Sequence, residues 1–247
     1  MLESLKEQVC KANLELPARG VVIYTWGNVS ALDRKRKLVV IKPSGVPYKS
    51  MTPDDMVVVN WEGQVVEGKL RPSSDLPTHL CLYHAFPEIS GIVHTHSLHA
   101  AVFAQAGEDI PPLGTTHADY FYGAIPCTRS LTEEEIRDAY EWNTGKVIAE
   151  TFRERNLSPL DMPAVLVRNH GPFTWGTGPE EAVYHAVVLE TVAEMALKTR
   201  MLNPKAHMDK ELLDKHYHRS MAPELTTGRA YISNFCTQKG RPRSAFF

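Results

Sequence analysis

Short apolar runs rich in β-branched residues constrain the fold most strongly, because tight turns rather than helices separate some of them. The run over 56–60 is followed by Glu62-Gly63 and then by Val65-Val66, a pattern typical of a β-hairpin. Hairpins outnumber clean β-α-β units along the chain, which predicts an α/β fold with a largely antiparallel sheet covered by helices. Strands are expected over 21–24, 38–41, 56–60, 91–93, 164–167 and 173–175.

Helical segments lie between these runs. Leu2, Leu5, Val9 and Ala12 recur at the spacing of an amphipathic helix near the start of the chain. Further helices are expected over 78–86, 98–106, 133–155 (one or two helices) and 179–200. With 247 residues the chain can form one large domain or two small ones, and no domain boundary is evident before about residue 205.

Charge and cysteine content argue against several classes of protein. The formal net charge of −2 gives no global field that would favour nucleic acid or an anionic membrane. No apolar stretch approaches the roughly 20 residues of a bilayer span, and the N-terminus lacks the basic and then apolar order of a signal peptide. The cysteines are scattered at Cys10, Cys81, Cys127 and Cys236, which favours free thiols in a reducing compartment. We therefore expect a soluble cytoplasmic enzyme without a nucleic-acid or membrane partner.

His94-Thr95-His96 follows the apolar run over 91–93 and is the first candidate metal site. A strand sends alternate side chains to one face, so both imidazoles point the same way. Two neutral imidazoles side by side are half of a ligand set for a divalent ion. A lone His-x-His is more often a pair of surface or packing histidines, so the interpretation depends on further ligands.

Two further candidate ligands come from separate turns. His170 lies in Asn169-His170-Gly171-Pro172, directly after an expected strand, and a buried hydrogen-bonded histidine is the alternative interpretation. Asp75 precedes an expected helix, where a helix cap is the alternative. Three histidines and a carboxylate together suit Zn²⁺ or another borderline divalent ion better than Ca²⁺ or Mg²⁺.

Three loops of small residues complete the pattern. Thr25-Trp26-Gly27-Asn28, Lys42-Pro43-Ser44-Gly45 and Ser73-Ser74 offer backbone N–H groups, hydroxyls, an amide and one lysine, which suit a phosphate group. None is a nucleotide-binding P-loop, and each loop alone is more often a plain turn. Asp119 lies among aromatic residues, where desolvation would raise its pKa and suit it to proton transfer. A loop-capping aspartate is the alternative.

The order of these motifs resembles the class II aldolase and adducin-head family, and within it the L-ribulose-5-phosphate 4-epimerases. The resemblance covers residues 1–219 and implies a three-layer α/β/α fold with a largely antiparallel central sheet. It rests on the segments 25–30, 41–46, 72–75, 91–97, 115–123 and 170–173.

The resemblance also implies roles for individual residues. One zinc ion per subunit, for which Mn²⁺ or Co²⁺ could substitute, would be bound by Asp75, His94, His96 and His170. The phosphorylated substrate would contact Gly27, Asn28, Ser44, Gly45, Ser73 and Ser74, with Lys42 close by. Asp119 would donate and accept a proton in the site of a neighbouring subunit, within a cyclic homotetramer whose active sites lie at subunit interfaces.

The implied reaction interconverts L-ribulose 5-phosphate and D-xylulose 5-phosphate, in arabinose or ascorbate breakdown. C4 of the sugar has no acidic proton, so inversion requires retro-aldol cleavage of the C3–C4 bond, rotation of the aldehyde and re-addition. Asp75 favours the epimerases, because related fuculose- and rhamnulose-phosphate aldolases carry Glu in that motif. Two alternatives stay open: a class II sugar-phosphate aldolase that releases the aldehyde, and a non-catalytic scaffold comparable to the adducin head.

The chain departs from the family after residue 219. The epimerases end close to Arg-Lys-His-Gly-Ala-x-Ala-Tyr-Tyr-Gly-Gln, which supplies a second acid/base tyrosine, whereas this chain continues as Ser-Met-Ala-Pro-Glu-Leu-Thr-Thr-Gly-Arg over 220–229. Suitable codons for the family's ending, translated one base out of frame, encode that segment throughout. We therefore expect an epimerase domain over 1–219 and interpret 220–247 as an atypical, frameshifted tail, with Thr226-Thr227 in place of the tyrosine pair. A natural lineage-specific tail is the alternative.

Overall fold

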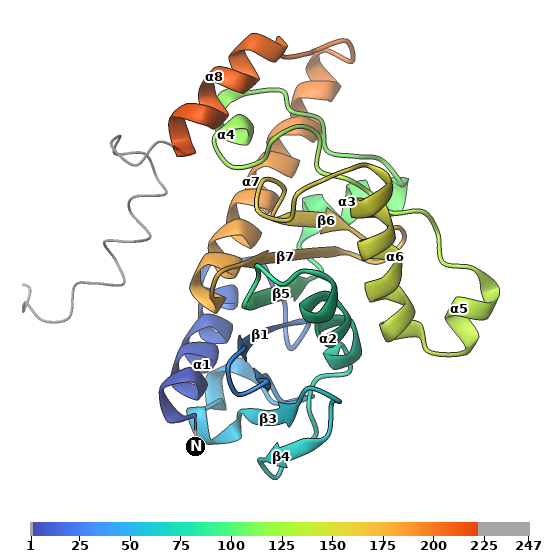
Figure 1. Ribbon diagram of the computed structural model, residues 1–247. Helices are drawn as coiled ribbons and strands as arrows, with labels where there is room; N and C mark the ends of the chain where they lie inside the picture. Colours follow the sequence, from blue (N-terminus) through green and yellow to red (C-terminus); the bar gives the residue numbers. More distant parts are fainter. Residues whose placement is uncertain (1, 222–247) are drawn as a thin grey trace, which may run out of the picture.

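The computed structural model describes residues 2–221, which form a seven-stranded sheet flanked by helices (Figure 1). The strands are β1 (Gly27–Asp33), β2 (Leu38–Ile41), β3 (Val57–Asn60), β4 (Val65–Glu67), β5 (Gly91–Thr95), β6 (Ala164–Leu166) and β7 (Pro172–Gly176). The α-helices are α1 (Glu3–Ala18), α2 (Leu76–Ala85), α3 (Leu98–Ala106), α4 (Thr115–Ala118), α5 (Glu133–Arg137), α6 (Tyr140–Glu154), α7 (Pro179–Leu202) and α8 (Lys210–Met221). Two short 3-10 helices cover Tyr48–Ser50 and Pro53–Asp55.

All neighbouring strands of the sheet are antiparallel, in the order β4-β3-β2-β1-β5-β7-β6. The largely antiparallel sheet predicted from the hairpin pattern is therefore confirmed, including the hairpin of β3 and β4. β5 lies inside the sheet, where His94 pairs with Asn28 of β1 on one side and with Phe173 of β7 on the other. The histidine motif is therefore held by strand pairing on both sides, with β1 and with β7.

Helices pack against both faces of the sheet (Figure 1). Along β2, Val39 and Ile41 belong to the large core with residues of α2 and α6, whereas Val40 belongs to a smaller core with residues of α1. The side chains of β5 also pack on opposite faces of the sheet: Ile92 belongs to the large core, whereas Val93 packs with residues of α1 and α7. Apolar side chains on both faces explain why these strands are near-continuous apolar runs.

The expected strand over 21–24 is wrong, because these residues turn away from the sheet and β1 begins at Gly27. Trp26 N donates to Ile23 O at 3.0 Å, and Tyr24 has a left-handed backbone with φ of 54°. Ile23 and Tyr24 are 61% and 80% exposed. Their β-branched and aromatic side chains favour a strand, but the chain reverses here between α1 and β1, and no described strand pairs with them.

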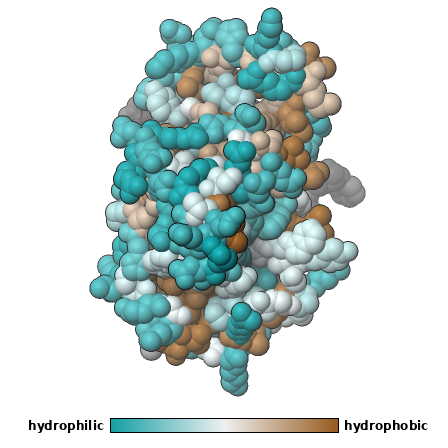
Figure 2. Space-filling model, turned by 90° about the vertical axis from the view of Figure 1, so that its right-hand side faces the viewer, coloured by the Kyte–Doolittle hydropathy of each residue, from teal (hydrophilic) through white to brown (hydrophobic). Residues whose placement is uncertain are grey.

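The other expected elements are present: β2 and α3 have the expected bounds, and the rest have shifted ends. The helical stretch over 133–155 divides into α5 and α6, with the break at residues 138–139. Hydrophilic residues predominate on the face that carries α5, and hydrophobic ones occur there in small separate patches (Figure 2). No helix within residues 2–221 is both long and apolar enough to cross a membrane.

The C-terminal division expected at residue 219 lies close to the end of the described residues. α8 continues to Met221. The rest of the predicted tail, with Thr226-Thr227, lies outside the described residues. The frameshift hypothesis therefore stays a prediction.

Candidate active site

His94 lies on β5, and the backbone of β7 fixes the orientation of its ring. Its Nδ1 donates a hydrogen bond of 2.9 Å to the carbonyl oxygen of Pro172. A carbonyl can only accept, so the proton sits on Nδ1 and Nε2 keeps its lone pair. That Nε2 lies 3.1 Å from Nε2 of His96, just beyond the end of the strand. The two imidazoles therefore converge on one side of β5, as strand alternation predicts.

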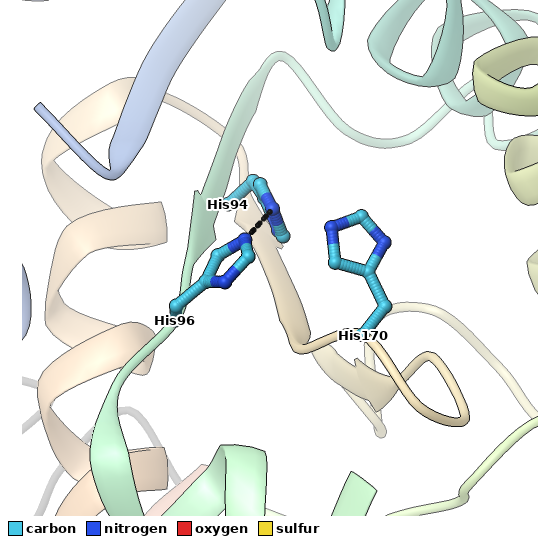
Figure 3. A group of neighbouring side chains, drawn as sticks. All are labelled: His94, His96 and His170. Carbon is cyan, nitrogen blue, oxygen red and sulfur yellow. Dashed lines mark hydrogen bonds between the residues drawn. The ribbon is translucent and has the colours of Figure 1, made fainter. Parts of the chain in front are cut away.

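His170 joins this pair from the turn between β6 and β7 (Figure 3). The turn places Asn169 at a φ of 61° and approaches β5 closely at position 171, where a Cβ would lie 2.7 Å from Thr95 O. Only glycine permits that approach. One ligand nitrogen from each of His94, His96 and His170 lies within 4.8 Å of the other two.

The three imidazoles fit a divalent metal ion in chemistry and in spacing. Zinc–histidine bonds of about 2.0–2.1 Å place tetrahedral ligands about 3.3 Å apart. The nitrogens of His94 and His96, 3.1 Å apart, come close to that separation. Burial lowers the pKa of all three rings, to about 3 for His170, which keeps them neutral and keeps their lone pairs available. The group could therefore hold a borderline divalent ion.

Asp75 lies directly before α2 but makes no side-chain hydrogen bond that would cap the helix. Instead, its Oδ2 accepts a hydrogen bond of 2.6 Å from Nδ2 of Asn28. Burial raises the pKa of this carboxyl, but the charges of His94 and His79 in their protonated forms and the hydrogen bond from Asn28 outweigh burial, and the pKa is lowered. The helix-cap alternative is not supported. Asp75 is nevertheless not a member of the convergent group of three histidines.

A cleft of about 580 Å³ opens at the histidine group. It is lined by every residue that the sequence motifs assign to metal or phosphorylated substrate: Gly27, Asn28, Lys42, Ser44, Gly45, Ser73, Ser74, Asp75, His94, His96 and His170. These residues come from β1, from β5 and from four loops. The fold thus gathers segments that lie far apart in the sequence into one concave surface.

The two serine-containing loops of the cleft are joined to each other by backbone hydrogen bonds. Ser44 N donates to Arg71 O at 2.8 Å, and Ser73 N donates to Lys42 O at 3.0 Å. This short ladder holds the hydroxyls of both loops on one wall of the cleft. Asn28 reaches the same wall, because its Nδ2 also donates to Ser73 Oγ at 3.1 Å.

Lys42 supplies an ammonium group at this wall although it is only 2% exposed. Its Nζ donates to the carbonyl of Pro43 at 3.2 Å and lies 5.0 Å from the ring centroid of Tyr48. Burial lowers the pKa of the Lys42 amine, and the charge of Asp75 opposes this. A buried ammonium held by a carbonyl and an aromatic face is well suited to bind an anion that enters the cleft.

No sequence motif marks Tyr140 and Glu141, yet both line the cleft. They begin α6, and Glu141 O accepts a hydrogen bond of 2.6 Å from the hydroxyl of Thr78 on α2. The Tyr140 hydroxyl lies 3.2 Å from Nδ1 of His170. Their position depends on the packing of α6 against α2, for which the local sequence carries no signal.

Asp119 does not line this cleft. It follows α4 and is half-buried. Its Oδ1 lies 3.0 Å from Nδ1 of His216 and 3.9 Å from the guanidinium Nη2 of Arg219, both on α8. The structure therefore separates Asp119 from the other expected site residues of its own chain. Its expected role in a neighbouring subunit stays a prediction.

A buried polar chain lies behind the cleft. The hydroxyl of Ser30 on β1 lies 2.7 Å from Nδ1 of His79 and 2.8 Å from the hydroxyl of Tyr83, both on α2. Burial lowers the pKa of His79 to about 3, so its ring is neutral. These bonds connect β1, which carries Asn28, to the helix that follows Asp75.

Comparison with known proteins agrees with this architecture. A family model described as the class II aldolase and adducin N-terminal domain matches residues 7–197. An L-fuculose 1-phosphate aldolase has a TM-score of 0.75 and 24% identity, with 89% of this chain and 97% of that chain covered. L-fuculose-1-phosphate aldolase from Thermus thermophilus has a TM-score of 0.64 and 25% identity, with 83% and 100% covered. An aldolase II superfamily protein from Pseudomonas syringae has a TM-score of 0.75 and 14% identity, with 94% and 90% covered.

Proposed function

This chain belongs to the class II aldolase and adducin family, and on that premise we propose that it interconverts L-ribulose 5-phosphate and D-xylulose 5-phosphate. The observation that carries the proposal is one cleft in which three convergent histidines face a wall built from Lys42 and the loop serines. The cleft has nitrogens that can bind a metal ion beside groups that can bind an anion. It therefore suits a small sugar phosphate whose two ends must both stay bound while the bond between them breaks.

The proposed reaction breaks and re-forms the C3–C4 bond. A base removes the proton of the C4 hydroxyl, and the electron pair of the C3–C4 bond passes into the enediolate of dihydroxyacetone. The other fragment is glycolaldehyde phosphate, whose phosphate stays on the wall of Lys42, Ser44 and Ser73 while the aldehyde group rotates. C3 then attacks the opposite face of the aldehyde, and the new C4 alkoxide takes up a proton.

The residues divide this work between them. His94, His96 and His170, with Asp75 as the proposed fourth ligand, would hold Zn²⁺, Mn²⁺ or Co²⁺. A bound divalent ion supplies positive charge that stabilises negative charge on the substrate oxygens. Asp119 would serve as one proton donor and acceptor from a neighbouring subunit of a cytoplasmic homotetramer.

A class II sugar-phosphate aldolase is the second candidate function. The similarity to the L-fuculose-1-phosphate aldolase from Thermus thermophilus, at 25% identity, is consistent with it. The difference between the two reactions is small, because an aldolase releases the aldehyde that an epimerase retains. A non-catalytic scaffold is less consistent with a histidine group complete enough to hold a metal ion.

The test is to incubate the purified, zinc-loaded chain with L-ribulose 5-phosphate and to identify the products by NMR. Accumulation of D-xylulose 5-phosphate supports the epimerase, whereas accumulation of free dihydroxyacetone and glycolaldehyde phosphate supports the aldolase. L-fuculose 1-phosphate is assayed in parallel. His96→Ala should abolish turnover, and His207→Ala, whose ring is exposed on the surface, is the matched control.

The same assay tests the interpretation of the tail. One sample carries the present residues 220–247, and a second carries the in-frame ending of the epimerases. We expect both samples to bind zinc, and we expect the first to epimerise measurably but much more slowly than the second. Full turnover by the first sample would contradict the expectation that this tail lacks a catalytic group. Re-sequencing the 3′ end of the gene tests the frameshift itself, and an intact in-frame reading of the present tail would refute it.

A further inference from the structure

We propose that Tyr140 is a positioning residue of the metal centre, and that its hydroxyl holds His170 in the orientation that presents Nε2 to the metal. The inference rests on the proposed metal site and deepens it. It assigns a function to a cleft residue that no sequence motif marks.

The orientation of His170 supports this assignment. Its ring directs one nitrogen toward His94 and His96 and the other away from them (Figure 3). The Tyr140 hydroxyl lies 3.2 Å from Nδ1, so the inward nitrogen is Nε2. A histidine that binds a metal through Nε2 carries its proton on Nδ1, and that proton needs an acceptor. The oxygen of Tyr140 is the acceptor within reach.

His94 shows the same design with a different partner. Its Nδ1 donates to the carbonyl oxygen of Pro172, which accepts only and therefore imposes one tautomer. A tyrosine hydroxyl can donate or accept, so Tyr140 can pair with His170 before and after the metal binds. Two of the three histidines are thus oriented by hydrogen bonds from outside the group.

Tyr140 is itself held in place by its neighbours. Its carbonyl accepts a hydrogen bond of 2.8 Å from the hydroxyl of Thr144, one turn along α6. The next carbonyl, that of Glu141, accepts from Thr78 on α2, three residues after Asp75. The start of α6 is therefore tied to the helix that follows the proposed carboxylate ligand, and it is well placed to orient His170 rigidly.

The test is the zinc affinity of Tyr140→Phe, measured by competition with a chromophoric chelator. Removing a hydrogen-bond partner of a metal ligand typically lowers affinity about 10- to 100-fold, and we expect a loss in that range. Tyr24→Phe is the matched control, because it removes the hydroxyl of an 80% exposed tyrosine and should leave the affinity unchanged. The thermal midpoint of the metal-free protein should be equal in both variants.

The Co²⁺-loaded protein provides a second measurement. Its visible absorption depends on ligand geometry, so Tyr140→Phe should shift the bands and Tyr24→Phe should not. Catalytic turnover of Tyr140→Phe should recover when zinc is raised to saturation. Unchanged zinc affinity and unchanged cobalt bands with a lower kcat would overturn the proposal and assign Tyr140 to proton transfer. Because affinity is measured without substrate, failure of the epimerase proposal would leave this result interpretable.

Discussion

Asn28 donates a hydrogen bond of 2.6 Å from Nδ2 to Oδ2 of Asp75. The same amide nitrogen reaches Ser73 Oγ, so one side chain connects the proposed metal side of the cleft to its phosphate side. The other end of the amide, Oδ1, is buried and has no hydrogen-bond partner within the described chain. Because buried acceptors normally have a partner, this unpaired oxygen of a cleft residue is suited to accept a hydrogen bond from a hydroxyl of the substrate.

Replacing Asn28 with alanine removes the hydrogen bonds that its Nδ2 donates to Asp75 and Ser73, and it removes the free acceptor Oδ1. A hydrogen bond to a charged group contributes about 1.5–3 kcal/mol, so Asn28→Ala should lower kcat/KM about 10- to 100-fold. Steady-state kinetics of the zinc-loaded enzyme measures the effect. Asn203→Ala, on the exposed loop after α7, is the control and should retain the activity of the unmodified chain. Equal kcat/KM in the two variants would refute the role of Asn28.

Lys42→Met should act mainly on KM. The buried ammonium is the cation at the loop wall, and its removal should raise KM for the phosphorylated substrate about 10- to 100-fold. Inorganic phosphate should inhibit the unmodified chain competitively and inhibit the variant weakly. The exposed Lys49→Met is the control. If kcat fell while KM and phosphate inhibition stayed the same, Lys42 would not be a phosphate ligand.

Local sequence patterns predict most strands but not β1, and the reason lies in Asn28 and Ser30. Both are buried in the strand, where Asn28 bonds to Asp75 and Ser30 bonds to His79 and Tyr83. Polar residues required by the site interrupt the apolar run, so the segment resembles a loop. The apolar residues over 21–24 resemble a strand more closely, although they form the turn before it.

The histidine group could be predicted because strand alternation and the Gly-Pro turn act locally. Tyr140 and Glu141 could not, because they reach the cleft through the packing of α6 on α2. Asp119 illustrates a third case. Its motif is local, but the expected function depends on a neighbouring subunit, which the fold of one chain does not contain.

Gly27→Ala should destabilise the protein far more than Gly45→Ala. At Gly27 a Cβ would lie 2.7 Å from Val22 Cγ1 and 2.9 Å from His94 O, with φ at 139°. Overpacking and backbone strain together should cost about 2–4 kcal/mol. At Gly45, where φ is 72° and no atom lies within 4 Å, the left-handed backbone alone should cost about 1–2 kcal/mol. Urea unfolding of the metal-free variants measures both, and equal midpoints would contradict the steric argument.

Stability should fall as the pH falls below about 6.5, the usual pKa of histidine in an unfolded chain. Burial lowers the pKa of His79 to about 3 and that of His117 to about 4. Between these pKa values and 6.5 the unfolded state binds more protons than the folded state. Each histidine therefore lowers the free energy of unfolding by about 1.4 kcal/mol for each unit that the pH falls. Urea unfolding of the metal-free protein at pH 7, 6 and 5 measures the slope. His117→Gln should reduce the number of protons taken up on unfolding at pH 5 by about one. The exposed His207→Gln should leave that number unchanged.

Asp119 should act across a subunit boundary, because in its own chain it contacts His216 rather than the cleft. Asp119→Asn and His96→Ala chains should each be inactive alone. Refolded together in equal amounts, they should recover about one quarter of the sites, because an intact site needs histidines from one variant beside Asp119 from the other. Activity is measured before and after subunit exchange, and mixing without exchange is the control. A mixture that stays inactive after confirmed exchange would exclude a shared site and leave Asp119 with the structural role that its contacts to α8 already provide.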